Sequence, residues 1–306
     1  MDLILPTPLH YLGEEVENKI YIKRDDMTGF AFGGNKARKN RYFIEEALKK
    51  EANHIITYGS VDSNHCRIVA AYAKKYKKKC TLILAETSNK KEKGNFSLYR
   101  FFEAKIKWTQ VDKVKETIDD TIKKIQIQNE KPYFIYGGAH GNLGTQAYVD
   151  AFKEIIEIDK FDYIFLASGT GTTQAGLIAG NSIFNEDKCK IVGISIARKE
   201  ENGKNIIKNS LKEYCIEKNI EISSEIYFSD KYIGSSYGDI YTEVKKTIKD
   251  VAFKYNIILD PIYTGKAFYG MKEYLKENKI KNKKILFLHT GGLPLFFKYQ
   301  DIIIGE

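Results

Sequence analysis

The sequence has few cysteines, few prolines and no long apolar run, and each scarcity excludes a class of protein. Its four cysteines, Cys66, Cys80, Cys189 and Cys215, form no Cys-x-x-Cys pair and are too scattered for a disulfide framework. A reducing, intracellular setting without a metal site is therefore expected. Only 5 prolines and 23 glycines exclude a collagen-like chain, and 43% hydrophobic residues exclude disorder as the main state.

Targeting and membrane signals are also missing from the sequence pattern. Residues 1–6 contain no basic stretch followed by an apolar one, which a secretory signal peptide requires. No apolar run approaches the ~18 residues needed to cross a bilayer. We therefore expect a cytoplasmic protein without a membrane partner.

Arginine is scarce although the chain is basic. The 49 Lys and Arg residues outnumber the 40 Asp and Glu residues, but only six are arginine, which leaves 43 lysines. Nucleic-acid recognition depends on clustered arginines, whereas these lysines are scattered. We therefore expect no nucleic-acid partner. The alternative, a basic nucleic-acid-binding protein, predicts salt-sensitive binding and no bound chromophore.

Short β-branched or aromatic runs alternate with longer segments of helical period, which is typical of parallel α/β folds. The expected strands are Ile55–Tyr58, Thr81–Ala85, Tyr133–Tyr136, Tyr163–Ala167, Ile191–Ile196 and Ile285–His289. The expected helices are Asn35–Lys50, Asn64–Lys77, Leu143–Ile156, Thr172–Phe184, Asp239–Tyr255 and Lys266–Glu277. A three-layer α/β/α architecture follows. No linker rich in Pro, Gly or Ser divides the 306 residues, so two domains must either interleave or share a long interface.

Two segments place polar side chains at the carboxyl ends of expected strands, where open α/β sheets bind ligands. Ser63-Asn64-His65 follows the strand Ile55–Tyr58 and either caps the next helix or displays donors to a cleft. The second segment combines glycines with hydroxyls at the start of a helix, as a phosphate-binding loop does. It consists of Ser168, Gly169, Thr170, Gly171, Thr172 and Thr173. An ordinary glycine-rich turn is the alternative for this second segment.

Three further segments carry reactive or hydroxyl side chains beside glycines. They are Gly33-Gly34-Asn35-Lys36, Tyr263-Thr264-Gly265 and Thr290-Gly291-Gly292. Each alone could be a structural corner. Their combination with the Ser-Asn loop and the glycine- and threonine-rich loop is more specific than any single piece.

In this combination the sequence resembles the family of D-cysteine desulfhydrases and 1-aminocyclopropane-1-carboxylate (ACC) deaminases. The resemblance covers nearly the whole chain, from Thr7-Pro8-Leu9 through residues 22–26 and 33–36 to residues 289–292. It implies pyridoxal phosphate as cofactor and a tryptophan-synthase-β-like fold (fold type II) of two three-layer α/β/α domains with mainly parallel sheets. It also implies a homodimer, with a large cofactor-binding domain of residues 1–38 and 149–306 and a small inserted domain of residues 39–148.

The resemblance also implies roles for individual residues. Lys36 is implied to bond the cofactor aldehyde and later to remove the substrate Cα proton, and Ser63 and Tyr263 to act beside it. Asn64, Thr290 and the loop Ser168–Thr173 are implied to bind the cofactor. The implied substrate contacts are Ser63, Asn64, His65, Tyr237, Tyr263 and Thr264.

Two threonines favour one activity within this family. Deaminases that open the cyclopropane ring have Glu after the active-site tyrosine and Leu before the terminal Gly-Gly, whereas this chain has Thr264 and Thr290. The resemblance therefore implies β-elimination of D-cysteine to pyruvate, hydrogen sulfide and ammonia. The alternatives are an ACC deaminase, another lyase of small D-amino acids such as D-serine, and a member without activity. Asp62 and the loop 137–142 depart from the family pattern and leave the small amino-acid substrate open.

Overall fold

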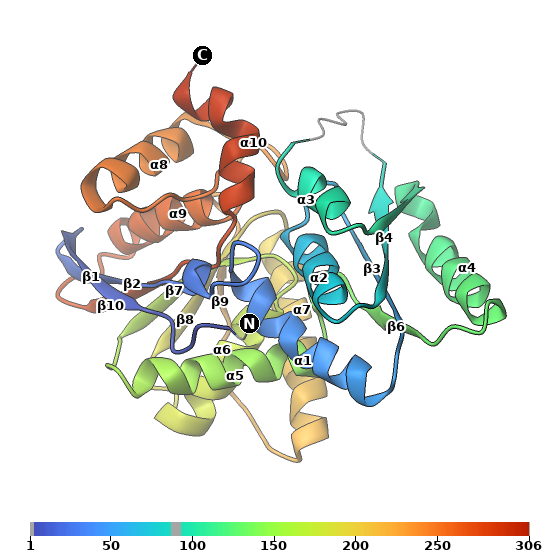
Figure 1. The fold of residues 1–306 in the computed structure, drawn as a ribbon. Helices are drawn as coiled ribbons and strands as arrows, with labels where there is room; N and C mark the ends of the chain where they lie inside the picture. The colour runs from blue at the N-terminus through green and yellow to red at the C-terminus, as the bar shows by residue number, and fades with distance from the viewer. Residues whose placement is uncertain (1–2, 87–92, 306) are drawn as a thin grey trace. The chain divides into compact units, whose positions relative to one another are not determined.

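The computed structural model describes residues 3–86 and 93–305 and has an α/β fold with mainly parallel sheets, as the sequence predicts (Figure 1). The chain divides into two compact units. Unit 1 consists of Met1–Asn35 and Gly141–Glu306, and unit 2 of Lys36–His140. The predicted roles of the two domains, cofactor binding for residues 1–38 with 149–306 and a small insert for 39–148, stay predictions.

Unit 1 contains a six-stranded sheet in the order β1-β2-β10-β7-β8-β9. The strands are β1 (Leu9–Glu15), β2 (Asn18–Lys23), β7 (Tyr163–Ser168), β8 (Lys190–Ser195), β9 (Tyr227–Ser229) and β10 (Lys284–Leu288). β1 pairs with β2 in antiparallel fashion, and every other pairing in this sheet is parallel. The carboxyl ends of β2, β7, β8, β9 and β10 therefore lie at one edge, which is where such sheets bind ligands.

Helices cover both faces of the unit 1 sheet (Figure 1). One face carries α8 (Thr242–Tyr255), α9 (Thr264–Glu277) and α10 (Leu293–Ile304), and the other carries α5 (Asn142–Ile156), α6 (Thr172–Asn185) and α7 (Glu200–Lys218). Successive side chains of a strand point to opposite faces. Accordingly, Leu286 packs with the α5, α6 and α7 core, and its neighbour Phe287 with the α8 and α9 core. Unit 1 thus has the expected three layers.

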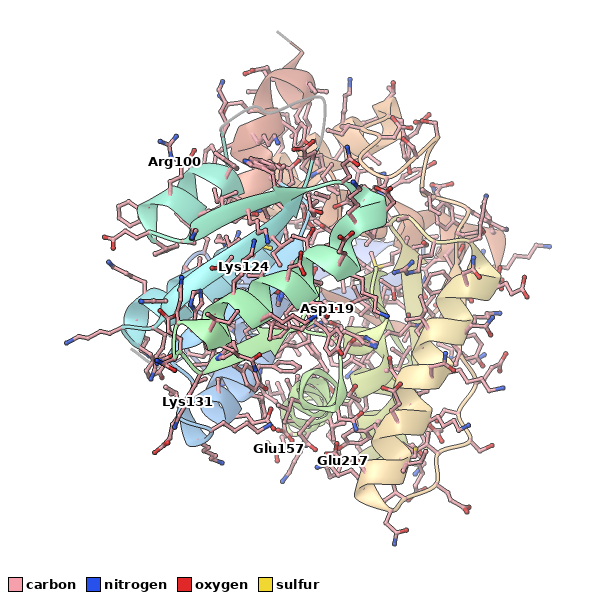
Figure 2. All side chains as sticks on the ribbon, turned by 90° about the vertical axis from the view of Figure 1, so that its right-hand side faces the viewer. Arg100, Asp119, Lys124, Lys131, Glu157 and Glu217 are labelled. Carbon is pink, nitrogen blue, oxygen red and sulfur yellow. The ribbon has the colours of Figure 1, made fainter. Side chains whose placement is uncertain are left out.

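Unit 2 contains a four-stranded parallel sheet in the order β5-β4-β3-β6. Its strands are β3 (His54–Gly59), β4 (Lys79–Ala85), β5 (Lys105–Thr109) and β6 (Pro132–Ile135), and its helices are α1 (Asn35–Lys49, whose first residue belongs to unit 1), α2 (Asn64–Lys75), α3 (Asn95–Phe101) and α4 (Val114–Ile127). α4 packs through Ile125 on Ile56 and Ile83, and α2 lies on the opposite face of the sheet (Figure 1). The outer side of α4 is charged, as Asp119 and Lys124 show (Figure 2).

The six strands and six helices expected from the sequence are all present, with small differences at their ends. β1, β2, β5, β9, α3, α4, α7 and α10 were not expected. Two short 3₁₀ helices, Asp25–Met27 and Val111–Lys113, complete the described elements. Among the described residues, no helix is long and apolar enough to span a membrane.

Candidate active site

The predicted segment at Gly34 is held by backbone hydrogen bonds within unit 1. The Gly34 N–H donates to the Asp25 carbonyl oxygen at 2.8 Å, and the Asn35 N–H donates to the Thr290 carbonyl oxygen at 3.0 Å. The φ of Gly34 is +104°, and a Cβ added there would lie 2.7 Å from the Thr290 oxygen. Only glycine fits this position, because a side chain would suffer both an unfavourable φ and a clash. These contacts fix the chain directly before Lys36.

A side-chain hydrogen bond connects the same segment to the loop rich in glycine and threonine. Asn35 Nδ2 donates to Thr173 Oγ1 at 3.1 Å, while the Asn35 backbone bonds to Thr290. Three of the five segments singled out in the sequence therefore meet within unit 1. They are the Gly34 segment, the loop after β7 and the segment that begins at Thr290.

The loop after β7 has the features of an anion-binding site. β7 ends at Ser168, and α6 begins at Thr172 after Gly171, whose φ is +79°. A Cβ on Gly171 would lie 3.0 Å from Ile207 Cγ1, so the packing and the backbone conformation both favour glycine. No described side chain caps α6. The N-terminus of α6, with the positive end of the helix dipole, is therefore a favourable place for an anion.

Ser168 adds a buried hydroxyl to this loop. The side chain is buried, and its Oγ forms no hydrogen bond with any described residue. A buried polar group left unsatisfied costs about 1–3 kcal/mol. A phosphate oxygen at the loop would satisfy the hydroxyl. The donors present therefore suit phosphate.

Two predicted tyrosines of unit 1 are hydrogen-bonded to each other. The hydroxyl oxygens of Tyr237 and Tyr263 are 2.9 Å apart, so one hydroxyl donates and the other accepts. Tyr237 is exposed and Tyr263 is partly buried. A phenol pair of this kind can deliver a proton to a group beside either hydroxyl.

Thr264, a predicted substrate contact, forms side-chain hydrogen bonds within its own turn. Its Oγ1 donates to Asp260 Oδ2 at 2.7 Å and accepts the Asp260 N–H at 2.8 Å. The N–H groups of Ile262 and Tyr263 also donate to the Asp260 carboxylate. Burial raises the pKa of Asp260, and the bonds from Thr264 and its neighbours oppose that rise. The Thr264 hydroxyl is thus used in the turn that begins α9.

The side chain of Thr290, unlike that of Thr264, forms no hydrogen bond with the described residues. The residue is buried and its carbonyl oxygen accepts the Asn35 N–H, but its hydroxyl bonds to no described residue. The preceding residue, His289, donates from Nε2 to the Ile258 carbonyl oxygen at 3.0 Å and accepts the Gly291 N–H at Nδ1. The Thr290 hydroxyl is therefore the group of this segment that can meet a ligand.

Unit 2 contributes a pair of neighbouring amines. Lys36 and Lys39 are three residues apart on α1, so their side chains share one face of the helix. Lys39 Nζ donates to the Gly138 carbonyl oxygen at 2.6 Å, and Lys36 Nζ donates to the same oxygen at 3.3 Å. The two amines thus share one acceptor. No carboxylate among the described residues forms a hydrogen bond or ion pair with either amine.

Burial makes Lys36 unusually acidic for a lysine. It lowers the pKa of Lys36 to about 8, and the hydrogen bond with Lys39 opposes this change. Burial also lowers the pKa of Lys39 well below its ordinary value, and the positive charge of Lys36 adds to the effect. Only the neutral amine is a nucleophile or a base, so a lowered pKa is what a reactive lysine requires.

His65, a predicted substrate contact, is buried in unit 2. Thr57 Oγ1 donates to the Ile135 carbonyl oxygen, so it accepts from His65 Nε2 at 2.7 Å. His65 Nδ1 then accepts from Asn40 Nδ2 at 3.1 Å. Burial and the two nearby lysine charges lower the pKa of His65 well below its ordinary value. Both ring nitrogens of this neutral imidazole are therefore occupied by side chains of unit 2.

Ser63 and Asn64 form the start of α2. Ser63 Oγ accepts the Cys66 N–H at 3.1 Å and caps the helix, as one interpretation of the sequence predicts. Asn64 Oδ1 accepts from Arg67 Nη1 and from Asn95 Nδ2, both at 2.9 Å. Because its oxygen is occupied twice, Nδ2 is the end of the Asn64 amide that can donate to a ligand.

Arg67 and Asn95 hold Asn64 through a buried network that the sequence interpretation missed. Arg67 Nη1 also donates to Asn95 Oδ1 at 2.9 Å, and Asn95 Nδ2 donates to the Asp62 carbonyl oxygen at 2.8 Å. Nothing in the sequence near Asn95 indicates this role. By contrast, the spacing of Lys39 from Lys36 could have indicated a shared helix face.

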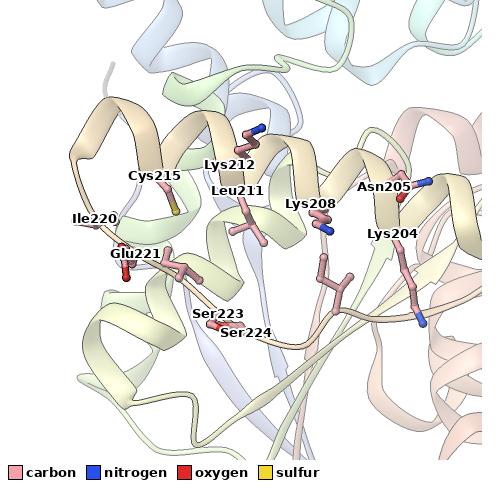
Figure 3. Close-up of a pocket in the computed structure, with 12 residues that line it drawn as sticks. Lys204, Asn205, Lys208, Leu211, Lys212, Cys215, Ile220, Glu221, Ser223 and Ser224 are labelled. Carbon is pink, nitrogen blue, oxygen red and sulfur yellow. The ribbon is translucent and has the colours of Figure 1, made fainter.

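A separate groove lies on the surface of unit 1, between α7 and the segment 220–226 (Figure 3). Lys204, Lys208 and Leu211 line it from the helix, and Ile222 lines it from the segment. No residue that the sequence predicts to be functional lines this groove. The predicted residues of unit 1 therefore lie elsewhere in that unit.

Comparison with known proteins identifies the family. Residues 1–291 match the family described as pyridoxal-phosphate dependent enzyme. The chain belongs to this family. Pyridoxal phosphate is therefore its cofactor, as the sequence predicts, and the tryptophan-synthase-β-like fold is confirmed.

The similarity to individual relatives extends over nearly the whole chain. A protein of Pyrococcus horikoshii named "Putative 1-aminocyclopropane-1-carboxylate deaminase" is 38% identical over 98% of this chain and 93% of its own length. The crystal structure of an ACC deaminase homologue has a TM-score of 0.92 at 35% identity and covers 100% of this chain and 95% of its own. A hydrogen sulfide-producing enzyme from Fusobacterium nucleatum shares the fold, with a TM-score of 0.69 at 20% identity over 95% of this chain and 97% of its own.

The residues present fit pyridoxal phosphate in each unit by itself. In unit 1, the uncapped N-terminus of α6 and the unpartnered Ser168 Oγ suit the phosphate group. In unit 2, the amine of Lys36, with a pKa of about 8, suits the aldehyde, and the free amide end of Asn64 suits a ring oxygen. These donors match the chemical groups of the cofactor.

Proposed function

We propose that the protein is a pyridoxal-phosphate-dependent lyase that removes sulfide from D-cysteine by β-elimination. The overall reaction consumes one water and gives pyruvate, hydrogen sulfide and ammonia. The observation that carries this proposal is the neutral hydroxyl of Thr290, a buried side chain whose hydroxyl bonds to none of the described residues. Cyclopropane-opening members of the family that this chain resembles have leucine at this position and glutamate in place of Thr264.

The Thr290 hydroxyl affects the choice of reaction, because it limits how strongly the site can stabilise negative charge on the substrate Cα. When bound, pyridoxal phosphate supplies a ring that accepts the electron pair left on Cα after proton removal. A carboxylate near the ring nitrogen would strengthen this effect, whereas Thr290 offers only a neutral hydrogen bond. Asp260 is held by the turn at Thr264 instead. Loss of a thiolate requires less stabilisation than opening of a carbon ring.

The proposal assigns roles to residues of this chain. Lys36 Nζ binds the cofactor aldehyde and, once released, takes the Cα proton. Ser63 Oγ and Asn64 Nδ2 bind and orient the substrate and the cofactor. The hydrogen-bonded hydroxyls of Tyr237 and Tyr263 supply the proton that the departing thiolate requires. The loop Ser168–Thr173 binds the phosphate.

A substrate panel tests the reaction. The purified enzyme is incubated separately with D-cysteine, L-cysteine, D-serine and ACC, and both sulfide and keto acid are measured. We expect sulfide and pyruvate from D-cysteine, in equal amounts, with little product from L-cysteine. Absence of sulfide that depends on D-cysteine would contradict the proposal.

ACC deamination is the second candidate, since a relative that is 38% identical carries that name. Ring opening of this four-carbon amino acid would give a four-carbon keto acid and ammonia without sulfide. The same panel separates the two candidates by the keto acid that forms. A cyclopropane substrate preferred over D-cysteine would show that the two threonines do not decide the reaction.

A homodimer and a cytoplasmic location belong to the same proposal. Both are expected from the resemblance and from the sequence pattern. Light scattering during gel filtration would measure the mass of the assembly, for which we expect twice the 35.1 kDa of one chain.

A further inference from the structure

We propose that Arg198 orients the phosphate-binding loop by holding one of its peptide groups, so that the Thr170 N–H faces the cofactor phosphate. The inference rests on the proposed function, because it concerns the phosphate that the loop Ser168–Thr173 is proposed to bind. It depends only on hydrogen bonds within unit 1. Arg198 is therefore a positioning residue, which acts on the cofactor through the backbone of the loop.

Arg198 is placed by the turn that follows β8. Ser195, the last residue of β8, is buried, and its Oγ accepts the Arg198 N–H at 2.9 Å and donates to the Arg198 carbonyl oxygen at 2.7 Å. The same Oγ accepts the Ala197 N–H at 3.3 Å. A serine hydroxyl has one donor and two acceptor sites, so all of them are used within this turn. The backbone at Arg198 is therefore fixed, although the residue itself is exposed.

The turn holds the carbonyl oxygens of two successive peptide groups of the loop. The Ile196 N–H donates to the Ser168 carbonyl oxygen at 3.3 Å. Arg198 Nε donates to the next carbonyl oxygen, that of Gly169, at 2.9 Å. In a trans peptide group, the C=O and N–H bonds lie in one plane and point in opposite directions. The N–H groups of Gly169 and Thr170, which belong to these two peptide groups, therefore both point away from the turn.

These two N–H groups are not used elsewhere in the described part of the chain. Neither the Gly169 N–H nor the Thr170 N–H donates to a described residue. Successive N–H groups that point to the same side form an anion-binding site, and the positive end of the α6 dipole follows directly in the chain. The loop Ser168–Thr173 has no charged side chain of its own. Its affinity for phosphate must therefore depend on how its N–H groups and hydroxyls are directed.

The charge of Arg198 is a second possible contribution, which has to be separated from the hydrogen bond. No carboxylate that the structure describes forms an ion pair with Arg198. Because the residue is exposed, water and salt screen its charge. Its neighbour Lys199 carries the same charge and lies 4.0 Å from Asp230, but it forms no hydrogen bond with the loop. The bond to Gly169 therefore distinguishes Arg198 from Lys199.

The binding of two probes to the full chain, freed of cofactor, tests the inference without measuring turnover. Pyridoxal phosphate and pyridoxal differ only in the phosphate group. The dissociation constant of pyridoxal divided by that of pyridoxal phosphate therefore measures the contribution of the phosphate, and fluorescence titration gives both constants. A variant that only loosens the fold raises both constants, whereas a misdirected Thr170 N–H weakens the binding of pyridoxal phosphate alone.

Substitutions at two adjacent positions separate the hydrogen bond from the charge. Arg198→Met removes both, and we expect the ratio of the two constants to fall by about 3- to 10-fold, the effect of one lost hydrogen bond. Arg198→Gln places an amide nitrogen as far along the side chain as Nε, so it keeps the donor and loses the charge. We expect this variant to stay close to the wild-type ratio. Lys199→Met removes an equal charge and should also keep that ratio.

The outcomes separate this inference from the proposed function. An unchanged ratio in Arg198→Met overturns the role of Arg198. A fall of equal size in Arg198→Gln or in Lys199→Met also overturns it, because charge then explains the effect. If Arg198→Met does not fold, Arg198→Ala takes its place. Gly171→Ala alters the loop itself, so an unchanged affinity for pyridoxal phosphate in that variant contradicts the proposed phosphate site, whatever Arg198 does.

Discussion

The two units offer ligand-binding groups in opposite ways. In unit 1, the loop after β7 offers backbone N–H groups at the start of α6 together with the Ser168 hydroxyl. In unit 2, the groups are side chains that are fixed by other side chains, as Asn64 is by Arg67 and Asn95. The backbone site depends on glycine conformations, whereas the side-chain site depends on its partners.

This difference determines which substitutions matter in each unit. A backbone site tolerates changes of side chains but not a Cβ where the chain needs a positive φ. A side-chain site tolerates changes outside its network but not the loss of one hydrogen-bonding partner. Substitutions of each kind can therefore confirm or break the comparison.

The largest expected effect is that of Lys36→Ala in unit 2. Removal of the amine takes away both the cofactor attachment and the base, so turnover of D-cysteine should fall by about 10³-fold or more. The change is measured as the rate of sulfide release at saturating substrate. Lys49→Ala on the same helix is the control and should keep wild-type turnover. Retained activity in Lys36→Ala would assign the chemistry to another residue.

The next effect is that of Gly171→Ala in unit 1. The φ of Gly171 is +79°, and the added Cβ would lie 3.0 Å from Ile207. A left-handed conformation costs a residue with a side chain about 1–2 kcal/mol, so cofactor affinity should fall by about tenfold. Fluorescence titration of the cofactor-free chain with pyridoxal phosphate measures the dissociation constant.

Gly169→Ala is the matched control in the same loop. Its Cβ would lie 3.4 Å from Ile196, an ordinary contact, and Gly169 has no positive φ. The dissociation constant should therefore stay close to the wild-type value. Equal losses in both variants would show that the loop binds through something other than the conformation at Gly171.

The fold was more predictable than the site because strands and helices carry periodic patterns. Buried strands such as β7 are continuous apolar runs that are easy to recognise. β1 was missed because it is an edge strand in which apolar and polar residues are mixed. β9 was missed because it has only three residues. α7 was missed because its lysines and asparagines obscure the apolar stripe around Ile207 and Leu211.

The candidate site was predictable where a local motif carries the chemistry. Gly171 and Lys36 could be singled out because glycine loops and a lysine at a helix start are visible in sequence. Asn95 was not found, because its role depends on an approach to Asn64 that tertiary structure alone creates. The environment of His65 was not predictable for a related reason, since the sequence could not show that Thr57 and Asn40 bond to both ring nitrogens.

Asn95→Asp tests the side-chain network with a smaller expected effect. The new carboxylate can still accept from Arg67, but it cannot donate to Asn64 Oδ1 or to the Asp62 carbonyl oxygen. A lost hydrogen bond costs about 0.5–1.5 kcal/mol, so the dissociation constant of the cofactor should rise by roughly 3- to 10-fold. The same fluorescence titration measures it.

Asn181→Asp is the matched control, because Asn181 is a buried asparagine of α6 that bonds to Cys189. It should lose stability without a comparable loss of cofactor affinity. If both variants lose affinity equally, the effect of Asn95 is a general loss of stability. Cofactor binding then does not depend on the way Asn95 orients the Asn64 amide.

The smallest expected effects are those of substitutions at Thr264 and Thr290, which we expect to differ in kind. Thr264→Val removes the hydroxyl that donates to Asp260 and accepts its N–H, so the free energy of unfolding should fall by about 1–2 kcal/mol. Thr290→Val removes a hydroxyl without a described protein partner and should leave that free energy nearly unchanged while lowering turnover. Urea denaturation and sulfide release measure the two quantities.

The pH dependence of unfolding sharpens this last comparison. Burial raises the pKa of Asp260 and the Thr264 hydroxyl opposes the rise, so the substitution should raise that pKa further. A carboxyl group whose pKa is higher in the folded state stabilises the fold when protonated, and this contribution is lost as pH rises through that pKa. Thr264→Val should therefore destabilise the protein more at neutral pH than at acidic pH, whereas Thr290→Val should show no such trend. An equal loss of stability at both pH values would mean that the Thr264 hydroxyl does not stabilise the ionised Asp260 carboxylate. The distinction between a structural Thr264 and a ligand-binding Thr290 would then be lost.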